Sequence, residues 1–351
     1  MSKRDIDLEY LDMFSRQILV SKIGLEGQKK LFKSRVLVVG GGALGSAIAI
    51  SMARLGVGFI RIVDPEFVEI SNIPRTLAFD YNDHIERTPK AYAVAREIKR
   101  VSPYTEVDYR VDVFEVDNAI DLARDVDLIL DGLDNMRTRF LVNEVAVTLN
   151  KPYVYAGVEG FYGVVMPVIP GKTACLRCIY SHASERDSRD ICNVVGVSIN
   201  TVMAVSSLAT SIAMKILLGK EIEQKIYYID LDSLEVRSFH AYRNPECPVC
   251  SKGLREFLGV TDVNKISRAC NNANNYRFLL SKAVSRIDPS IAAEKRFRVS
   301  EDRFRYIIRR DEITIELFKN SRVGYVFNIN KEDLLQDLIK EIERIAIEYK
   351  P

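Results

Sequence analysis

Apolar and polar positions along the first half of the chain form a pattern that predicts strands and helices in alternation. Residues 35–64, RVLVVGGGALGSAIAISMARLGVGFIRIVD, combine an apolar strand, a glycine turn, a helix of small residues and a second apolar strand that ends on an acid. A helix over 89–101 follows, then the strand EVDYRVDV and a helix near 117–124. This alternation predicts an α/β fold with a doubly wound, mostly parallel sheet, whose ligands bind at the carboxyl ends of the strands.

The alternation continues for two more strands and then changes. The run VDLILDGLD has the composition of a fully buried parallel strand, and the helix MRTRFLVNEVAVTLN and the strand PYVYAG follow it. Beyond them, FYGVVMPVIPG is rich in strand-forming residues, and KIYYIDLDSLEVRSFHAY predicts a hairpin that turns near Asp232 and Ser233. The sequence therefore predicts an antiparallel extension of the parallel sheet.

The end of the chain has a pattern of its own. FRYIIRR, ITIELF and VGYVFNI predict three meandering strands, and NKEDLLQDLIKEIERIAIEYK predicts an amphipathic helix capped by Asn330. The apolar stripe of this helix consists of Leu335, Leu338, Ile339, Ile342 and Ile345. The predicted organisation is a main domain over 1–251, a linker over 252–275 and a small α+β module over 276–351, whose role the sequence leaves open.

One apolar stretch, SINTVMAVSSLATSIAMKILLG, is about as long as a membrane span. Asn200, several hydroxyl groups and Lys215 interrupt it, so the sequence favours a helix buried inside the protein and no membrane partner. The segment MSKRDIDLEYLDMFSRQ lacks the apolar core of a secretory signal. A formal net charge of +2 with 28% charged residues argues against wholesale binding of nucleic acid.

Four of the six cysteines fall in two pairs, CLRC and CPVC. A C-x-x-C pair presents two thiolates to one metal ion, and two pairs complete a tetrahedral site. The candidate zinc ligands are Cys175, Cys178, Cys247 and Cys250. The gap between the pairs is longer than in a zinc ribbon, so spacing alone favours zinc only moderately. A redox dithiol is the alternative, and the long gap and the second pair count against it. Without a secretory signal, the pattern favours free thiols in a reducing compartment, and we expect the protein in the cytoplasm.

The glycines Gly40, Gly42 and Gly45 have the G-x-G-x-x-G spacing of a Rossmann-like nucleotide site. The first glycine permits a tight turn, the second lets the backbone approach a phosphate, and the third lets helix and strand pack closely. Asp64 ends the second strand, where a carboxylate binds ribose hydroxyls. These residues alone suit NAD, FAD or any adenosine nucleotide, and a scaffold without a nucleotide also stays open.

The residues that follow Asp64 discriminate between these nucleotides. A triphosphate carries roughly four negative charges, so its site needs cations and usually Mg²⁺, whereas a dinucleotide needs no metal. Asn72, Arg75 and Lys90 supply donors and positive charge, and Asp134 follows a buried strand, where it could hold the metal. Each could be a solvated surface residue, but together at strand ends they favour ATP.

Eight pieces of the sequence, in order along residues 10–250, resemble the ubiquitin-activating-enzyme superfamily, in particular its ThiF, HesA and MoeB branch. They are FSRQILVSKIGLEGQKKL, VLVVGGGALGS, VDPEFVEISNIPRT, RTPKA, DGLDNMRTRFLVN, CLRC, ICNVVGV and CPVC. The resemblance implies ATP-dependent adenylation of the C-terminal glycine of a small ubiquitin-like or sulfur-carrier protein that ends in Gly-Gly, with release of pyrophosphate.

The resemblance also assigns roles to individual residues. Those that it places against the nucleotide, its phosphates and, for the last, Mg²⁺ are Asp64, Asn72, Arg75, Lys90 and Asp134. Arg16 matches an arginine that reaches the triphosphate from the other protomer, which implies a homodimer. Family members often carry the same two cysteine pairs, which strengthens the prediction of a structural zinc ion. The chain departs from the family at Arg75-Thr76, where many members have Arg-Gln.

Cys192 lies between a charged segment and the long apolar helix. We predict that it is a nucleophile that takes the activated acyl group from AMP as a thioester, or passes sulfur through an acyl disulfide. Arg186 and Arg189 would favour its thiolate form. A buried, inert thiol is the alternative interpretation, since most free cysteines are of this kind.

Three other functions stay open beside activation of a carrier. The chain could activate another carboxylate, on a tRNA base or a short peptide. It could be a nicotinamide-dependent oxidoreductase that uses the same glycine turn. It could also be a non-catalytic subunit, although the presence of Arg16, Arg75, Lys90 and Asp134 in one chain counts against this.

Overall fold

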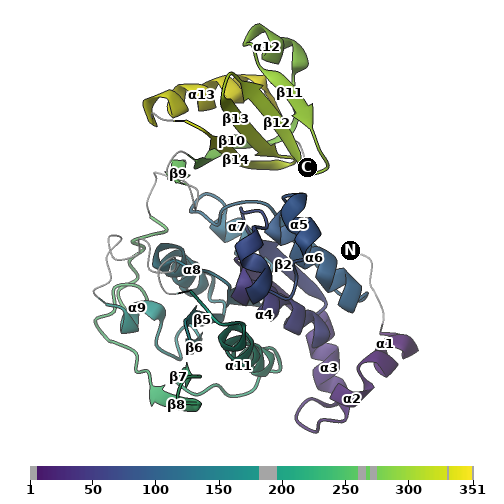
Figure 1. The fold of residues 1–351 in the computed structure, drawn as a ribbon. Coiled ribbons are helices and arrows are strands. Elements are labelled where there is room, and N and C mark those ends of the chain that lie inside the picture. Colours follow the sequence, from purple (N-terminus) through teal and green to yellow (C-terminus); the bar gives the residue numbers. More distant parts are fainter. Residues whose placement is uncertain (1–5, 182–195, 260–265, 269–274, 330–331, 350–351) are drawn as a thin grey trace. The chain divides into compact units, whose positions relative to one another are not determined.

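The computed structural model describes residues 6–181, 196–259, 266–268, 275–329 and 332–349. The chain divides into two units, and Figure 1 shows the first in purple to green and the second in green to yellow. Unit 1 comprises Met1–Tyr109 and Phe114–Thr261, and unit 2 comprises Arg110–Val113 and Asp262–Pro351.

An eight-stranded sheet runs through unit 1 in the order β3-β2-β1-β4-β5-β6-β7-β8. β1 pairs in parallel with β2 and β4, and β4 pairs in parallel with β5. From β5 to β8 the pairing is antiparallel. This arrangement confirms the predicted α/β sheet with its antiparallel extension. The strands are β1 (Arg35–Val39), β2 (Phe59–Val63), β3 (Glu106–Arg110), β4 (Leu128–Asp131), β5 (Tyr153–Glu159), β6 (Tyr162–Val168), β7 (Lys225–Asp230) and β8 (Glu235–His240).

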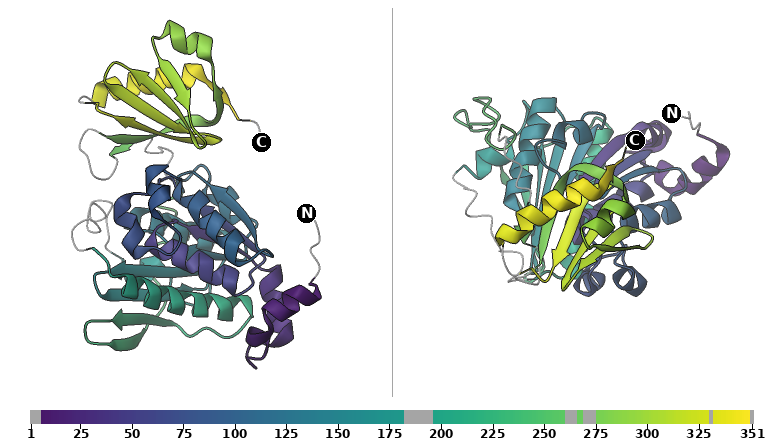
Figure 2. Two further views of the ribbon diagram at one scale, coloured as in Figure 1. Left: turned by 45° about the vertical axis from the view of Figure 1, so that its right-hand side comes forward. Right: turned by 90° about the horizontal axis from the view of Figure 1, so that it is seen from above.

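Helices cover both faces of this sheet because its central strands are apolar on both sides. Val36 and Val38 of β1 belong to a core shared with α4, α6 and α11, whereas Leu37 and Val39 belong to one shared with α7 and α8. Figure 2 shows these layers from two further directions. The helices are α1 (Leu8–Met13), α2 (Ser15–Ile18), α3 (Gly24–Lys33), α4 (Ala43–Arg54), the 3₁₀ helix η1 (Ile70–Arg75), α5 (Tyr81–Ile85), α6 (Lys90–Val101), α7 (Ala119–Ala123), α8 (Met136–Leu149), α9 (Leu176–Ile179) and α11 (Ile199–Leu217).

Among the described helices, α11 alone is long and apolar enough to cross a membrane by length and composition. In this fold it packs against α4, β5 and β6. Val205, Ala209 and Ala213 lie on its buried side, and the hydroxyl of Thr210 donates to the carbonyl oxygen of Ser206 at 2.8 Å. These contacts agree with the prediction that this helix packs inside the protein.

Unit 2 contains a sheet in the order β11-β12-β13-β14-β10-β15, with β9 paired to β10. The three predicted strands correspond to β12, β13 and β14, and the whole predicted apolar stripe of α13 is buried in the core of the unit. The right-hand view of Figure 2 shows α13 lying across the strands. Asn330, the predicted cap, lies outside the described residues. The elements are β9 (Ile266–Arg268), β10 (Tyr276–Ile287), α12 (Pro289–Glu294), β11 (Arg298–Glu301), β12 (Arg305–Arg310), β13 (Ile313–Phe318), β14 (Ser321–Phe327), α13 (Glu332–Ile345) and β15 (Ala346–Glu348).

The sequence did not predict four strands of unit 2. β9 lies within the range predicted as a linker, and β10 shifts its register between Leu279 and Val284, where polar residues interrupt the apolar alternation. β11 pairs with β12 at the edge of the sheet. The prediction of helix up to residue 350 was wrong at its end, because Ala346–Glu348 leaves the helix and pairs with β10. This pairing depends on the backbone groups of β10, which the sequence pattern of residues 346–348 does not indicate.

Candidate active site and metal centre

In the turn between β1 and α4, Gly40 and Gly45 are closely packed against backbone atoms, whereas Gly42 borders open space. Gly40 has a φ of +91°, and its N–H donates to the carbonyl oxygen of Val63 at 2.8 Å. A Cβ on Gly45 would lie 1.9 Å from the carbonyl oxygen of Gly40. A Cβ on Gly42 would meet no atom within 4 Å. Gly42 precedes α4, so the free space lies where the N–H groups of a helix start can bind an anion.

Asp64 follows β2 and is buried beside this turn. One carboxylate oxygen accepts the N–H of Gly41 and the other accepts the N–H of Glu66, each at 2.7 Å. Burial, with a smaller contribution from the charge of Glu66, raises the pKa of Asp64 to about 6 against the opposing effect of Lys90. Since each carboxylate oxygen accepts more than one hydrogen bond, both keep acceptor capacity for ribose hydroxyls.

Lys90 is the first residue of α6, and its ammonium lies 2.5 Å from the carboxylate of Glu66. Their backbones also pair, because the N–H of Lys90 donates to the carbonyl oxygen of Glu66 at 2.8 Å. Burial lowers the pKa of Lys90, but the charges of Glu66 and Asp64 outweigh burial and raise it above its usual value. Lys90 is therefore a fixed cation. Sequence reasoning missed Glu66, which no periodic signal marks.

Asp134 lies in the loop between β4 and α8 and is exposed. The side-chain amide of Asn135 donates to its carboxylate at 3.3 Å, and Asn135 also caps α8. The charge of Asp134 contributes to the raised pKa values of both Lys90 and Arg139, so it acts on these two cations. The glycine turn, Asp64, Lys90 and Asp134 thus gather at the carboxyl ends of β1, β2 and β4.

The 3₁₀ helix η1 carries the next two predicted residues. Asn72 is buried, and its side-chain oxygen accepts the N–H of Glu69 at 3.1 Å, which completes a capping box. Arg75 is half-buried at the end of this helix. The hydroxyl of Thr76, where many family members have Gln, is buried and has no hydrogen-bond partner among the described residues. Asn72 therefore shapes η1 whether or not it also contacts a nucleotide.

Another predicted residue, Arg16, stands apart from this grouping. Arg16 is exposed on α2, beside an apolar groove. The groove is lined by Leu11, Ser15, Arg16, Ile18, Leu19 and Leu25. Among the described contacts, none joins Arg16 to the glycine turn. Cys192, together with Arg186 and Arg189, lies outside the described residues.

The two cysteine pairs come together into one cluster, with all four Sγ atoms within 4.8 Å of one another. Cys175 and Cys247 are 3.6 Å apart at sulfur, and Cys178 and Cys250 are 3.4 Å apart. Four sulfurs around a tetrahedral zinc ion, with bonds of about 2.3 Å, would be roughly 3.8 Å apart, whereas a disulfide is about 2.05 Å long. A hydrogen bond with Cys175 lowers the pKa of Cys178 to about 4. The donor set and spacing fit a four-thiolate metal site.

Helix α8 anchors the segment that carries Cys175 and a segment that follows Cys250. The side-chain oxygen of Asn143 accepts the N–H of Leu176, next to Cys175, at 2.8 Å. The carboxylate of Glu144 accepts three backbone N–H groups of the segment 256–258, at 2.8–3.0 Å. Sequence reasoning missed this pair, although two polar residues inside the apolar run FLVNEVAV were a usable signal. The helix that starts beside Asp134 therefore also holds the four-cysteine cluster in place.

The ThiF family matches residues 14–249, which is more than half of the chain. The chain belongs to the ThiF family. The sulfur carrier protein ThiS adenylyltransferase of Bacillus subtilis is 31% identical over 316 residues, covering 88% of this chain and 93% of the relative. The sulfur carrier protein adenylyltransferase of Thermus thermophilus is 32% identical, covering 69% of this chain and 91% of the relative.

A solved structure, E. coli MccB with ATP, shares the fold of this ThiF-family chain at a TM-score of 0.59 and 22% identity, covering 68% of this chain and 74% of that one. The match to the Bacillus subtilis relative is longer than unit 1, so it extends into unit 2. The named activities of the relatives place the chain among the adenylyltransferases, and it is an enzyme of this class.

Proposed function

We propose that this chain uses ATP to adenylate the C-terminal glycine carboxylate of a small ubiquitin-like or sulfur-carrier protein. The observation that carries the proposal is the grouping of the glycine turn, Asp64, Lys90 and Asp134 at one edge of a ThiF-family sheet. The relatives named as sulfur carrier protein adenylyltransferases support a carrier as the substrate. The family match favours this function over a nicotinamide-dependent oxidoreductase.

In the proposed step, an oxygen of the terminal carboxylate attacks the α-phosphorus of ATP. The bond from this phosphorus to the oxygen that leads to the β-phosphate breaks, pyrophosphate leaves, and an acyl adenylate remains on the carrier. Since two anions must meet, the site has to neutralise phosphate charge and hold the attack in line. Lys90 supplies the positive charge, and the phosphates compete with the carboxylate of Glu66 for its ammonium group. Asp64 holds the ribose.

Mg²⁺ that arrives with ATP would supply further charge neutralisation, and Asp134 would be its protein ligand. Mg²⁺ keeps several waters and usually takes one or two carboxylates besides phosphate oxygens. An exposed carboxylate on the loop after β4 suits this requirement. The charge of Asp134 acts on Lys90, which supports a place for the metal next to the phosphates.

We propose zinc as the ion of the four-cysteine cluster, in a structural role. The spacing of the sulfurs supports it, and α8 holds the segments on either side. A cluster of free thiols also favours a reducing compartment, so we propose the cytoplasm as the location.

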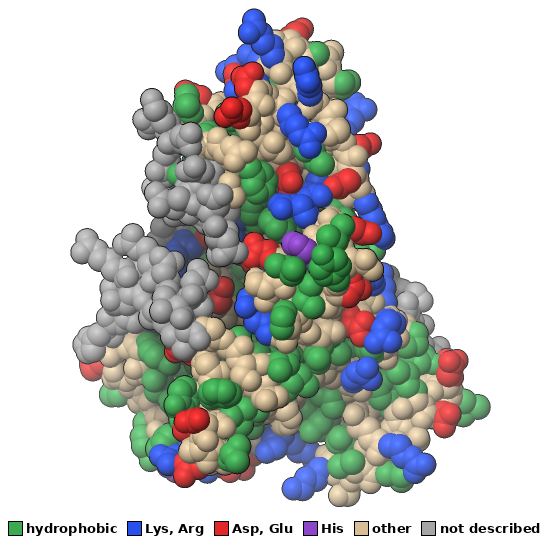
Figure 3. Space-filling model, viewed as in Figure 1, with side chains coloured by type: hydrophobic (Ala, Val, Ile, Leu, Met, Phe, Trp, Pro, Cys, Tyr) green, Lys and Arg blue, Asp and Glu red, His purple; other side chains and the backbone are tan. Residues whose placement is uncertain are grey.

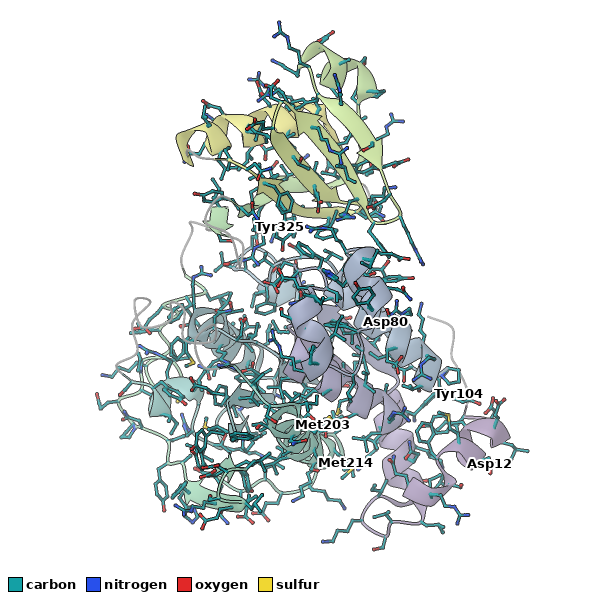
Figure 4. The ribbon with its side chains drawn as sticks, viewed as in Figure 1. Asp12, Asp80, Tyr104, Met203, Met214 and Tyr325 are labelled. Carbon is teal, nitrogen blue, oxygen red and sulfur yellow. The ribbon has the colours of Figure 1, made fainter. Side chains whose placement is uncertain are left out.

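We propose a homodimer in which Arg16 of each protomer serves the site of the other. Leu19 and Leu25 beside the groove are 74% and 41% exposed, and Met203 on α11 is 40% exposed. Figure 4 labels Met203 and Met214 on α11, and Figure 3 shows hydrophobic side chains gathered over this part of unit 1. The ammonium of Lys30 on α3 donates to the carbonyl oxygen of Leu218, so the end of α11 lies against α3. Contiguous exposed apolar surface is typical of an interface.

Mixing two inactive variants tests the shared site. In a mixed dimer of Arg16→Ala and Lys90→Met, the site with an intact Lys90 receives its arginine from the other protomer. Co-refolded equimolar mixtures should therefore recover about a quarter of the wild-type activity per site, because half of the dimers are mixed and each mixed dimer has one complete site. A mixture that stays inactive would place Arg16 in the site of its own protomer.

Cys192 is proposed to receive the acyl group after adenylation. Its thiolate would attack the carbonyl carbon of the adenylate, AMP would leave with the bonding electrons, and a thioester would form. The wild-type chain should form a hydroxylamine-sensitive adduct with the carrier, and Cys192→Ala should form none. Full transfer activity of Cys192→Ala would contradict this role and leave the adenylation step intact.

Carrier-dependent exchange of labelled pyrophosphate into ATP tests the main proposal. A carrier that ends in Gly-Gly should support exchange, and the same carrier without these two residues should not. Lys90→Met should abolish the exchange, whereas Lys99→Met, an exposed lysine on the same helix, should retain it. Exchange with a peptide or a tRNA base but with no carrier would change the substrate. Tight binding of NAD without binding of ATP would refute adenylation.

A further inference from the structure

A buried hydrogen-bond network lies under the loop that carries Asp134. Asp131 is the last residue of β4, and its side chain is fully buried. Its carboxylate accepts the phenol hydroxyl of Tyr153 at 2.5 Å, the N–H of Leu133 at 2.9 Å and the Nε–H of Arg139 at 3.2 Å. Since a buried carboxylate needs each of these donors, the three partners are held in one geometry.

Arg139 extends the network from α8 back to the same loop. Its Nη2 donates to the carbonyl oxygen of Leu133 at 2.6 Å and to that of Ala156 on β5 at 2.9 Å. Leu133 is thus fixed at its N–H by Asp131 and at its carbonyl by Arg139. The next residue along the chain is Asp134, so the network sets where the backbone presents that carboxylate.

The other side of the loop rests on the glycine turn. The N–H of Gly132 donates to the carbonyl oxygen of Val39 at 2.8 Å. A Cβ on Gly132 would lie 2.4 Å from the carbonyl oxygen of Gly40 and 2.6 Å from Cα of Gly45. The loop therefore cannot move toward the glycine turn, and its remaining freedom is controlled by Asp131 and Arg139.

We propose that Tyr153 is a positioning residue for magnesium and ATP, which acts through Asp131 and Arg139 on the loop of Asp134. The proposal rests on the proposed role of this site in binding ATP with Mg²⁺. Tyr153 is itself fully buried on β5 and is not placed to touch the nucleotide. Without its hydroxyl, the carboxylate of Asp131 loses its shortest hydrogen bond and can rotate. Leu133 and Arg139 then lose a fixed partner, and Asp134 is presented less accurately to the metal.

Two tyrosines on the same strand provide a matched test. Tyr153→Phe removes the hydroxyl that donates to Asp131. Tyr155→Phe removes a hydroxyl that lies 3.5 Å from the hydroxyl of Tyr180, and it keeps the ring beside Arg139. Both variants lose one oxygen from one strand, so a general loss of packing would affect both. Calorimetric titration with ATP, at a series of Mg²⁺ concentrations and without Mg²⁺, gives the readout and needs no carrier.

Tyr153→Phe should raise the Mg²⁺ concentration for half-maximal strengthening of ATP binding about three- to tenfold, the effect of one hydrogen bond. Its affinity for ATP without Mg²⁺ should stay within about twofold of wild type, and Tyr155→Phe should match wild type in both. Equal Mg²⁺ dependence in the two variants would overturn the inference.

A second pair of variants covers the case in which Tyr153→Phe does not fold. Arg139→Lys keeps the charge but cannot reach Asp131, Leu133 and Ala156 together, so its Mg²⁺ dependence should shift in the same direction. Arg137→Lys, whose arginine pairs with Glu115, is its control on the same helix. No shift in Arg139→Lys would overturn the inference. If the wild type binds ATP with Mg²⁺ but shows no carrier-dependent exchange, only the proposed substrate fails.

Discussion

Replacement of Gly45 by alanine tests the close approach of α4 to the ends of β1 and β4. The new Cβ would lie 1.9 Å from the carbonyl oxygen of Gly40, 2.9 Å from its carbonyl carbon and 3.2 Å from Cα of Gly132. All of these are backbone atoms, so no side chain can rotate away. A Cβ rarely comes closer than about 3 Å to such atoms, so helix and strand must separate by roughly 1 Å.

The cost of this separation follows from the packing around it. Gly40 cannot retreat, because it has a φ of +91° and donates to Val63. Overpacking of a tight core costs typically about 1–3 kcal/mol, and a site with backbone on every side belongs at the upper end. At least about 2 kcal/mol corresponds to a fall in Tm of roughly 4–8 °C for a unit of this size.

Differential scanning calorimetry is the suitable assay, since the chain contains no tryptophan for fluorescence. Gly42→Ala is the matched control in the same turn, because a Cβ there meets no atom within 4 Å. Gly42→Ala should keep the Tm of unit 1 within about 1 °C of wild type and weaken ATP binding at least about tenfold, since its methyl group occupies the space proposed for a phosphate. A Tm for Gly45→Ala equal to that of Gly42→Ala would refute the steric argument, and unchanged ATP binding by Gly42→Ala would refute the phosphate position.

Three further predictions concern charge and metal. The pKa of Asp64 lies near 6 instead of 3.8, so its ionisation opposes folding as the pH rises from about 4 to 6. Adenosine binding needs the carboxylate, so its affinity should strengthen about tenfold between about pH 5 and 7. Asp64→Asn should bind adenosine weakly and without this pH dependence. Cys250→Ser should reduce bound zinc, measured by atomic absorption, and lower the Tm of unit 1 by at least about 5 °C; zinc content equal to wild type would contradict the cluster. Glu144→Gln leaves the three backbone N–H groups of the segment 256–258 with one acceptor oxygen instead of two, so chemical denaturation should show a loss of about 1–3 kcal/mol in the free energy of unfolding. No loss would mean that water replaces the carboxylate.

The sheet of unit 1 could be predicted because its signals are local. Val36 to Val39 are buried in turn on opposite faces, which requires an unbroken apolar run, and this run is visible in one short piece of sequence. The glycine spacing is equally local, since Gly40 and Gly45 lie within one turn and helix start. Asp64 and Asp134 could be chosen as candidates because polar residues directly after apolar strands lie at the carboxyl edge of a parallel sheet.

Other parts of the site could not be predicted, because they join residues that are distant in sequence. Glu66 meets Lys90 across 24 positions, and Tyr153 meets Asp131 across 22. Neither pair belongs to a repeating pattern, so only the packing of one segment on another selects it. The end of α13 was missed for the same reason, since Ala346–Glu348 has the composition of a helix and pairs with β10 only because that edge is present.

The sequence by itself determined which chemical groups stand at the ends of the strands and which residues could bind a metal. The sequence also grouped the two cysteine pairs, 72 residues apart, as one candidate site, and the structure brings their sulfurs together. The tertiary structure alone decided that Tyr153 reaches the loop of Asp134 through two buried charged groups. The periodicity of apolar residues indicates which face of a helix or strand packs against the core. The partner of a buried polar group depends on how several elements pack together, and the cost of leaving that group without a partner enforces the choice once they have packed.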